Sequence, residues 1–186
     1  MQPYFLPYLG HWQLMSKVDT WLVFDDIQFI QKGWINRNKI TNIQDDSKHL
    51  YLNIPLTGRH KKTLIKDIKI NNQNDWRRIL SRRFGSLDKR AHYFYEANDF
   101  LNHVLDFQTK WLIEFLFYSI ELTQSLLNLN NSLMLQSVDC SSVHSGLEIE
   151  PDGWALELTQ LIGAKHYINP EGGKHLFLND KFKKAG

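Results

Sequence analysis

The sequence predicts an α/β fold in a single domain, with a mixed or mostly parallel sheet flanked by helices. The chain has 186 residues, which is within the ~100–200 residues of one domain. Of these residues 42% are hydrophobic, enough to build a sizeable core. Apolar runs of strand length alternate with segments whose apolar residues recur at the helical period. We therefore expect one domain over residues 1–186.

Apolar patterning predicts the elements of the first half. Pro7 precedes an apolar-periodic run that predicts a helix over about residues 9–17. The compact apolar run 21–24 stops at two aspartates, as a strand buried on both faces would. Further strands are expected over residues 34–40, 50–56 and 63–70.

Beyond residue 73 the apolar period changes to that of helices. Asn74 or Asp75 can cap a helix that ends at Gly85. A longer helical region is expected from about residue 93 to 129, with a break near Asp106. The remaining expected elements are a strand over 133–138, a polar loop over 141–150, a helix over 154–162 ended by Gly163, a strand over 166–169 and a turn over 170–173.

Positive charge is concentrated in one stretch of the chain. The net charge is only +2, but residues 59–90 contain eleven Lys or Arg and three Asp, a local charge of 11 − 3 = +8. Such a segment can attract the phosphate of a nucleotide, a nucleotide-sugar or a nucleic acid. The alternative is a solvated helix face. No RNA-binding, zinc-finger or helix-turn-helix motif is present, so a nucleic acid is not the expected partner.

Several classes of protein are excluded by composition. The most apolar stretch, residues 111–122, is too short to span a membrane and contains two glutamates, and the N-terminus lacks the pattern of a secretory signal. With one cysteine, Cys140, there is no disulfide framework, and the eight histidines lack a metal-ligand spacing. We expect a cytoplasmic protein without a membrane span or a metal site. The sequence identifies neither a cofactor nor an oligomeric state.

The first candidate site segment is residues 2–10. Two prolines and three aromatic residues make it a rigid, non-regular loop. Ligands of open α/β sheets bind beyond the carboxyl ends of the strands, where such loops lie, which makes Gln2 and Tyr4 candidate ligand-binding residues. The alternative is an aromatic plug over the core.

The second candidate segment contains Asp25 and Asp26 at the end of the strand over 21–24. Paired carboxylates at a strand end can act as a general base or hold a divalent cation. Arg37, in the segment that follows, offers a planar cationic fork for a carboxylate, a phosphate or a sugar hydroxyl. The alternative is an internal ion pair between Asp25 and Arg37.

Residues 34–38 complete the second segment. Trp34 is a flat apolar wall of the kind that stacks on sugars or bases. Asn36 and Asn38 flank Arg37 and could orient polar groups. In a strand the two asparagines point to one face and Arg37 to the other, so the three serve one site only if a bulge intervenes.

Two further groups have weaker patterns. Gly172 and Gly173 follow a predicted strand, and their backbone amides could approach an anion; a simple turn is the alternative. Cys140 and His144 could pair as nucleophile and base, whereas a lone cysteine at a strand end is typically a small buried hydrophobe.

These motifs together resemble one known family. QPYFLPYLGHWQL, WLVFDDIQF and GWINRNKI resemble the start of the WbqC-like proteins, and LYLNIPL and ELTQLIGAKHYINPEGGKHLF resemble later stretches of them. The resemblance spans about residues 2–178. It implies a first apolar strand before Gln2 and a C-terminal segment after the region of Phe182, both outside this chain. His11 stands where the family usually has an aromatic residue and is assigned no role.

The resemblance implies a function in bacterial surface-polysaccharide (O-antigen) biosynthesis. The expected activity is transfer of an acyl or aminoacyl group, such as glycyl, to a sugar or nucleotide-sugar. Asp25 is the expected general base, and Arg37 is expected to hold an anionic group. The alternative is a non-catalytic protein of the same pathway that binds a sugar or nucleotide or serves as a scaffold. The expected substrate-binding residues are Gln2, Tyr4, Asp26, Gln28, Trp34, Asn36, Asn38, Tyr167, Gly172 and Gly173.

Overall fold

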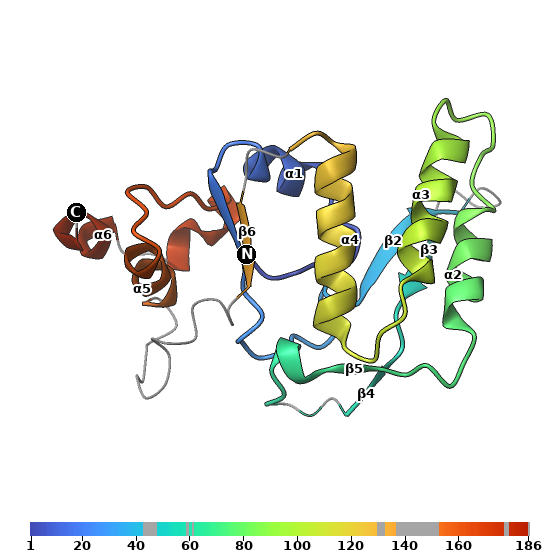
Figure 1. Ribbon diagram of the computed structural model, residues 1–186, viewed down its shortest axis with the longest axis horizontal. Helices are drawn as coiled ribbons and strands as arrows, with labels where there is room; N and C mark the ends of the chain where they lie inside the picture. The colour runs from blue at the N-terminus through green and yellow to red at the C-terminus, as the bar shows by residue number, and fades with distance from the viewer. Residues whose placement is uncertain are drawn as a thin grey trace.

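The chain forms a mixed α/β fold, which confirms the predicted class (Figure 1). Among the described residues, however, the elements come in runs, mainly strands over residues 20–70 and helices over residues 76–126, so the predicted alternation of helices and strands is not observed. The computed structural model describes residues 1–42, 48–58, 60, 62–129, 133–136, 153–176 and 179–185. The expected loop over 141–150, together with Cys140 and His144, lies outside the described residues.

The strands of the described residues pair as three two-stranded sheets. One pair is parallel and two are antiparallel, so the mixture of strand directions is confirmed, although the strands do not form one continuous sheet. The parallel pair joins β1 (Thr20–Val23) to β6 (Leu133–Gln136), and the antiparallel pairs join β2 (Arg37–Thr41) to β3 (His49–Asn53) and β4 (Leu56–Thr57) to β5 (Lys69–Ile70).

The helices α1 to α5 begin and end close to their predicted limits, whereas α6 was not predicted. The predicted break in the long helical region separates α3 from α4, and Gly163 follows α5 with a positive φ of 67°, which glycine adopts without strain. No helix in the described part of the chain is long and apolar enough to cross a membrane. The helices are α1 (Leu9–Met15), α2 (Trp76–Phe84), α3 (Phe94–Asp106), α4 (Leu112–Leu126), α5 (Trp154–Leu161) and α6 (Asn179–Ala185).

The predicted strand over residues 63–70 is largely wrong. Ile65–Asp67 forms a 3-10 turn, η1, and only Lys69–Ile70 is a strand. The reason is the three-residue spacing of Ile65 and Ile68, since a tight turn buries both side chains completely in the core.

The predicted strand over residues 166–169 is also wrong. These residues are irregular and are followed by a second 3-10 segment, η3 (Glu171–Leu176). Tyr167 and Ile168 are both exposed, and no strand of the described residues pairs with them. A short apolar run forms a β-strand only where a neighbouring strand can hydrogen-bond to it.

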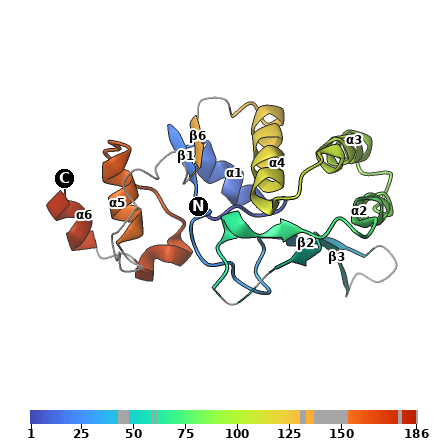
Figure 2. The same cartoon turned by 60° about the horizontal axis from the view of Figure 1, so that its bottom comes forward.

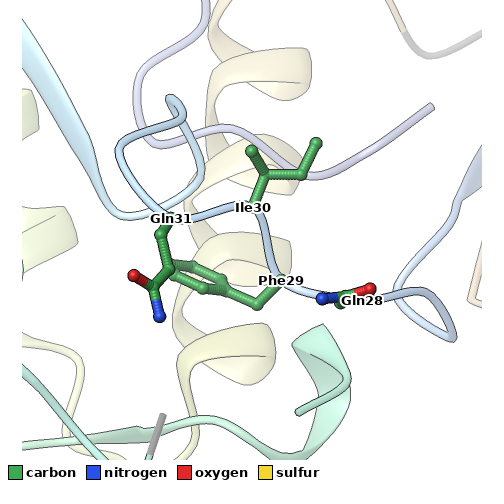
Figure 3. A pocket seen from close by; sticks show the side chains of 4 residues that line it. All are labelled: Gln28, Phe29, Ile30 and Gln31. Carbon is green, nitrogen blue, oxygen red and sulfur yellow. The ribbon is translucent and has the colours of Figure 1, made fainter. Parts of the chain in front are cut away.

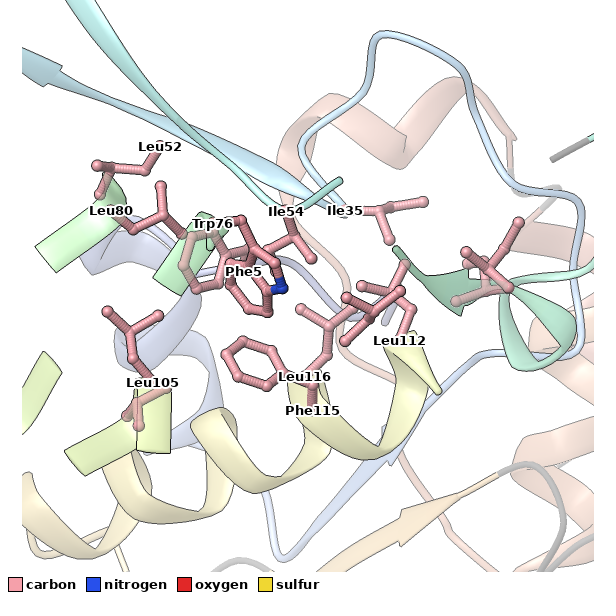
Figure 4. Close-up of a cluster of buried hydrophobic side chains, with 14 of the residues drawn as sticks. Phe5, Ile35, Leu52, Ile54, Trp76, Leu80, Leu105, Leu112, Phe115 and Leu116 are labelled. Atoms are coloured by element: carbon pink, nitrogen blue, oxygen red, sulfur yellow. The ribbon is translucent and has the colours of Figure 1, made fainter. Parts of the chain in front are cut away.

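Helix α4 contributes buried residues to two hydrophobic clusters. Both views show this helix between α1 with the β1–β6 pair on one side and α2 with α3 on the other (Figures 1 and 2). The larger cluster lies among α2, α3, α4 and the β2–β3 pair, and Phe5, Trp76 and Phe115 meet in it (Figure 4). Ring centroids are 6.1 Å apart for Phe5 and Phe115 and 5.5 Å apart for Trp76 and Phe115. The smaller cluster packs α1 and β1 against the other side of α4; its buried members are Trp12, Met15, Trp21, Val23, Ile113 and Ile120.

Candidate functional site

The N-terminal segment connects the two regions that the sequence analysis singled out. At one end the backbone N–H of Phe24 donates to the carbonyl of Met1 (2.7 Å), and the Met1 amine donates to the carbonyl of Leu22 (2.6 Å). At the other end the N–H of Phe5 donates to the carbonyls of Trp34 (3.2 Å) and Ile35 (3.1 Å). Residues 2–4, with the candidates Gln2 and Tyr4, therefore run from the carboxyl end of β1 to the start of the β2 region.

Asn38 holds this segment in place. Its side-chain amide donates to the carbonyl of Phe5 (3.2 Å) and to that of Leu6. Leu6 has a φ of 49°, a left-handed conformation that is unusual for leucine and needs such support. The interactions of Asn38 are thus with the loop that contains Gln2 and Tyr4, and its effect on a ligand would act through that loop.

Asp25 lies at the carboxyl end of β1 and is only 3% exposed. Its backbone carbonyl accepts a hydrogen bond from the N–H of Lys66 (3.1 Å). The Lys66 ammonium makes an ion pair with Asp26 (2.6 Å), and this hydrogen bond raises the pKa of Lys66, with smaller contributions from the charges of Asp67 and Asp25. One ammonium group therefore lies near both carboxylates.

This arrangement does not form a metal centre with other ligands. No group of three or more His, Cys, Asp or Glu that could hold a metal ion occurs among the described residues. Lys66 offers the positive charge that a divalent cation would otherwise supply to the two carboxylates.

Gln28 lines an open pocket of about 380 Å³ together with Phe29, Ile30 and Gln31 (Figure 3). The residues that line the pocket follow the two aspartates in the chain. Residues 25–29 run antiparallel to residues 63–66. The hydrogen bonds between these segments include Ile65 N–H to the Ile27 carbonyl (2.9 Å) and Phe29 N–H to the Thr63 carbonyl (2.9 Å).

Arg37 closes a tight turn that precedes β2. Its Nε donates to the carbonyl of Gly33 (3.0 Å), and its Nη2 donates to that of Lys32, which has a positive φ of 63°. The guanidinium lies over the rings of Trp34 and Tyr51, at 5.6 and 5.3 Å from their centroids. Within the described residues no ion pair joins Arg37 to Asp25.

Asn36 points into the protein. It is 6% exposed, and its amide donates to the side chain of Asn53 (3.2 Å) and to the carbonyl of Ile54 (2.9 Å). Asn36 and Asn38 therefore make structural hydrogen bonds, while Arg37 and Trp34 are on the accessible side. Within β2, Arg37 and Asn38 are consecutive and so lie on opposite faces of the strand, whereas Asn36 precedes the strand.

The C-terminal candidates lie apart from Arg37. Both views show η3 beside α5 and the β1–β6 pair rather than near β2–β3 (Figures 1 and 2). The ring of Tyr167 stacks on Phe182 (5.5 Å), and the N–H of Gly173 donates to the carbonyl of Pro170 (2.9 Å), which closes a turn. Gly172 is exposed.

Three residues near the site were not predicted from the sequence. Lys66 lies beside the two aspartates because residues 25–29 pair with residues 63–66. Tyr51 lies beside Arg37 because of the β2–β3 register. His11 is buried, at 2% exposure, against the rings of Trp21 (centroids 4.7 Å apart) and Tyr4 (5.9 Å). Its departure from the aromatic residue that the family pattern has at this position is the one signal that marked it.

The fold and site define an α/β protein with a buried carboxylate beside a rigid N-terminal loop, and comparison with known proteins gives its family. The chain belongs to the WbqC-like protein family, whose model matches residues 2–186. It is similar to the uncharacterized protein Rv1507c of Mycobacterium tuberculosis (strain ATCC 25618 / H37Rv), with 28% identity over 102 residues. The match covers 54% of this chain and 42% of the mycobacterial protein. No solved structure matches the chain.

Proposed function

We propose that this protein is a cytoplasmic transferase that moves an acyl or aminoacyl group, such as glycyl, onto a sugar or nucleotide-sugar of a bacterial surface polysaccharide. The observation that carries the proposal is Asp25, a buried carboxylate at the end of β1 beside the loop of residues 2–4. Shielding from water strengthens the interaction of this carboxylate with a substrate group that reaches it.

In the proposed reaction Asp25 takes the proton from an amine or hydroxyl of the sugar as that atom attacks the acyl carbon of an activated donor. The new bond from nitrogen or oxygen to the acyl carbon forms, and the bond to the leaving group breaks with its electron pair. The proton then passes from Asp25 to the leaving group or to water. Arg37 holds a phosphate or carboxylate of the substrate, while Gln2 and Gln28 orient polar groups.

The test incubates the protein with candidate nucleotide-sugars, glycine and ATP or an activated donor, and detects the added group by mass spectrometry. We expect a product with the wild type and a loss of turnover of about 100-fold or more for Asp25→Asn, with ligand affinity changed by less than about tenfold. The matched control is Asp67→Asn, an exposed aspartate beside Lys66, which should retain turnover. No product across a broad panel would contradict the proposal.

A binding or scaffold protein of the same pathway is the second candidate. It is favoured by Arg37, Trp34 and Tyr51, which form an accessible surface that needs no general base. For such a protein Asp25→Asn would lower ligand affinity as much as any activity, because no interaction specific to the transition state would be lost.

A further inference from the structure

One face of the β2–β3 pair is open, and its side chains are polar, cationic and aromatic. Strand alternation and register place Arg37, Lys39 and Thr41 of β2 on it, opposite Asn53, Tyr51 and His49 of β3. The other face packs Leu52 into the larger core cluster, next to Leu80 of α2 (Figure 4). None of the six residues on the open face is acidic.

Two large aromatic side chains flank the cation on this face. Trp34 is 42% exposed and Tyr51 is 44% exposed, and the guanidinium of Arg37 lies over both rings. Arg83 of α2 also donates a hydrogen bond to the backbone carbonyl of Tyr51, on the side of the pair that packs on α2. Exposed rings in fixed positions are surfaces on which a planar ligand group can stack.

Arg37 has hydrogen-bonding capacity left for a ligand. A guanidinium has five N–H donors, and Arg37 uses one at Nε and one at Nη2 for the carbonyls of Gly33 and Lys32. The other three have no partner in the part of the chain that the structure describes. Lys39 is exposed directly across from Tyr51 and adds a second positive charge.

We infer that this open face binds the nucleoside diphosphate part of a nucleotide-sugar. The base stacks on Tyr51 and Trp34, and the phosphates bind Arg37 and Lys39. This inference rests on the proposed function and adds to it the part of the substrate that is recognised, together with Tyr51 and Lys39 as binding residues. A planar base joined to two negative charges matches the paired rings and cations.

The distance to Asp25 fits such a substrate. Met1 is hydrogen-bonded beside Phe24, and Phe5 is hydrogen-bonded to Trp34. The four residue steps between Met1 and Phe5 span at most about 14 Å even when fully extended. The backbone of Trp34 is therefore close enough to the end of β1 for one extended ligand to reach from the open face toward Asp25.

The test measures binding of UDP, GDP, ADP and TDP, each separately, to the whole chain by isothermal titration calorimetry. We expect at least one of them to bind, and Tyr51→Ala to weaken its binding by about 5- to 150-fold, the usual effect of removing a stacking ring. Lys39→Gln should weaken binding by about tenfold because it removes a positive charge from the face. Arg37→Lys should also weaken binding by about tenfold, because a point charge does not replace a guanidinium fork. Lys39→Gln keeps the test valid if Arg37→Lys disturbs the turn at Lys32. Tyr95→Ala, which removes a 65% exposed ring of α3, is the matched control and should leave the affinity unchanged.

Three results would overturn the inference. One is the absence of binding of all four diphosphates at millimolar concentration. Another is inorganic pyrophosphate binding as tightly as the best diphosphate, since the rings would then have no part. The third is a single-stranded RNA binding more than about 100-fold tighter, which would make the face a nucleic-acid surface.

Asp25→Asn separates this inference from the proposed transfer reaction. If Asp25→Asn retains diphosphate affinity and even the wild type forms no transfer product, the binding face stands and the transferase proposal fails. If product forms but no diphosphate binds, the transferase proposal stands and the binding face fails.

Discussion

The two hydrophobic clusters on either side of α4 bury polar side chains in different ways. Beside the larger cluster, the amide of Asn36 is buried and donates hydrogen bonds to Asn53 and Ile54. Beside the smaller cluster, His11 is buried among aromatic rings, and neither ring nitrogen has a hydrogen-bond partner within the described residues.

This difference indicates where the protein is sensitive to pH. Amide hydrogen bonds do not change between pH 4 and 8, so the packing around Asn36 is insensitive to acid. An unpartnered imidazole must stay neutral to remain buried, because a charged ring loses its hydration without compensation. Burial, with a smaller effect of the nearby Met1 amine, lowers the pKa of His11 to about 4.

The largest expected effect is on the larger cluster. Phe5 is fully buried and packs against Phe115, so Phe5→Ala should lower the free energy of unfolding by about 3–5 kcal/mol, measured by urea denaturation. The loss should be the same at pH 7 and pH 5. Tyr8→Ala is the control in the same loop; this 65% exposed ring should cost less than about 0.5 kcal/mol. A similarly small loss of unfolding free energy for Phe5→Ala would mean that the N-terminal loop does not pack against the core.

The second prediction is a loss of stability in acid that comes from His11. The pKa of about 4 in the folded protein lies below the ~6.5 of the unfolded chain, so the unfolded state binds the proton more readily. The contribution is present in full above pH 6.5 and is lost as the pH falls from 6.5 to 4. About 3 kcal/mol of stability is lost over this range, which urea denaturation at several pH values can measure.

His11→Phe isolates this effect from other titrating groups, including the Met1 amine. A phenyl ring fits an environment of Trp12, Trp21 and Tyr4 and cannot take up a proton. The stability difference between the variant and the wild type should therefore grow in favour of the variant below pH 6.5. A constant difference would show that the pKa of His11 does not change on folding.

The third prediction concerns Asn36. Asn36→Ala leaves the buried carbonyl of Ile54 without this donor, and should cost about 1–3 kcal/mol at any pH between 5 and 8. Asn53→Ala removes an exposed acceptor of the same amide, and should cost less than about 1 kcal/mol because Asn36 keeps its bond to Ile54. Thermal melts of both variants compare the two losses. Equal losses would mean that burial of Asn36 does not determine its contribution.

Much of this organisation can be predicted from the sequence where a local signal decides the structure. Asp75 and Gly85 flank α2 as predicted, and the aspartates that follow the apolar run 21–24 lie at the end of β1. Strand alternation also predicts that Arg37 and its flanking asparagines face opposite sides. In each case the determining residues are neighbours in the chain.

The rest depends on contacts between distant segments. Residues 63–70 contain both an alternating pattern and the three-residue spacing of Ile65 and Ile68, and the sequence alone does not decide between them. In the fold, pairing with residues 25–29 places this segment on the core, where the turn buries both isoleucines. Tyr51 has no signal of its own, since its place beside Arg37 follows from the β2–β3 register. The buried state of His11 likewise comes from packing of α1 on β1.

The smallest expected effect distinguishes the two roles that the sequence allowed for Asp25 and Arg37. An internal ion pair would make the stability losses of Asp25→Asn and Arg37→Lys strongly non-additive in the double mutant. The guanidinium instead donates to Gly33 and Lys32, and Lys66 is the ammonium near Asp25. We therefore expect the losses to add within about 0.5 kcal/mol, as for independent sites. The measurement is a double-mutant cycle by urea denaturation at pH 7, with Lys66→Met and Asp26→Asn as a positive control for coupling between paired residues. A coupling of 1 kcal/mol or more between Asp25 and Arg37 would assign both residues to the scaffold and remove Arg37 from the binding face.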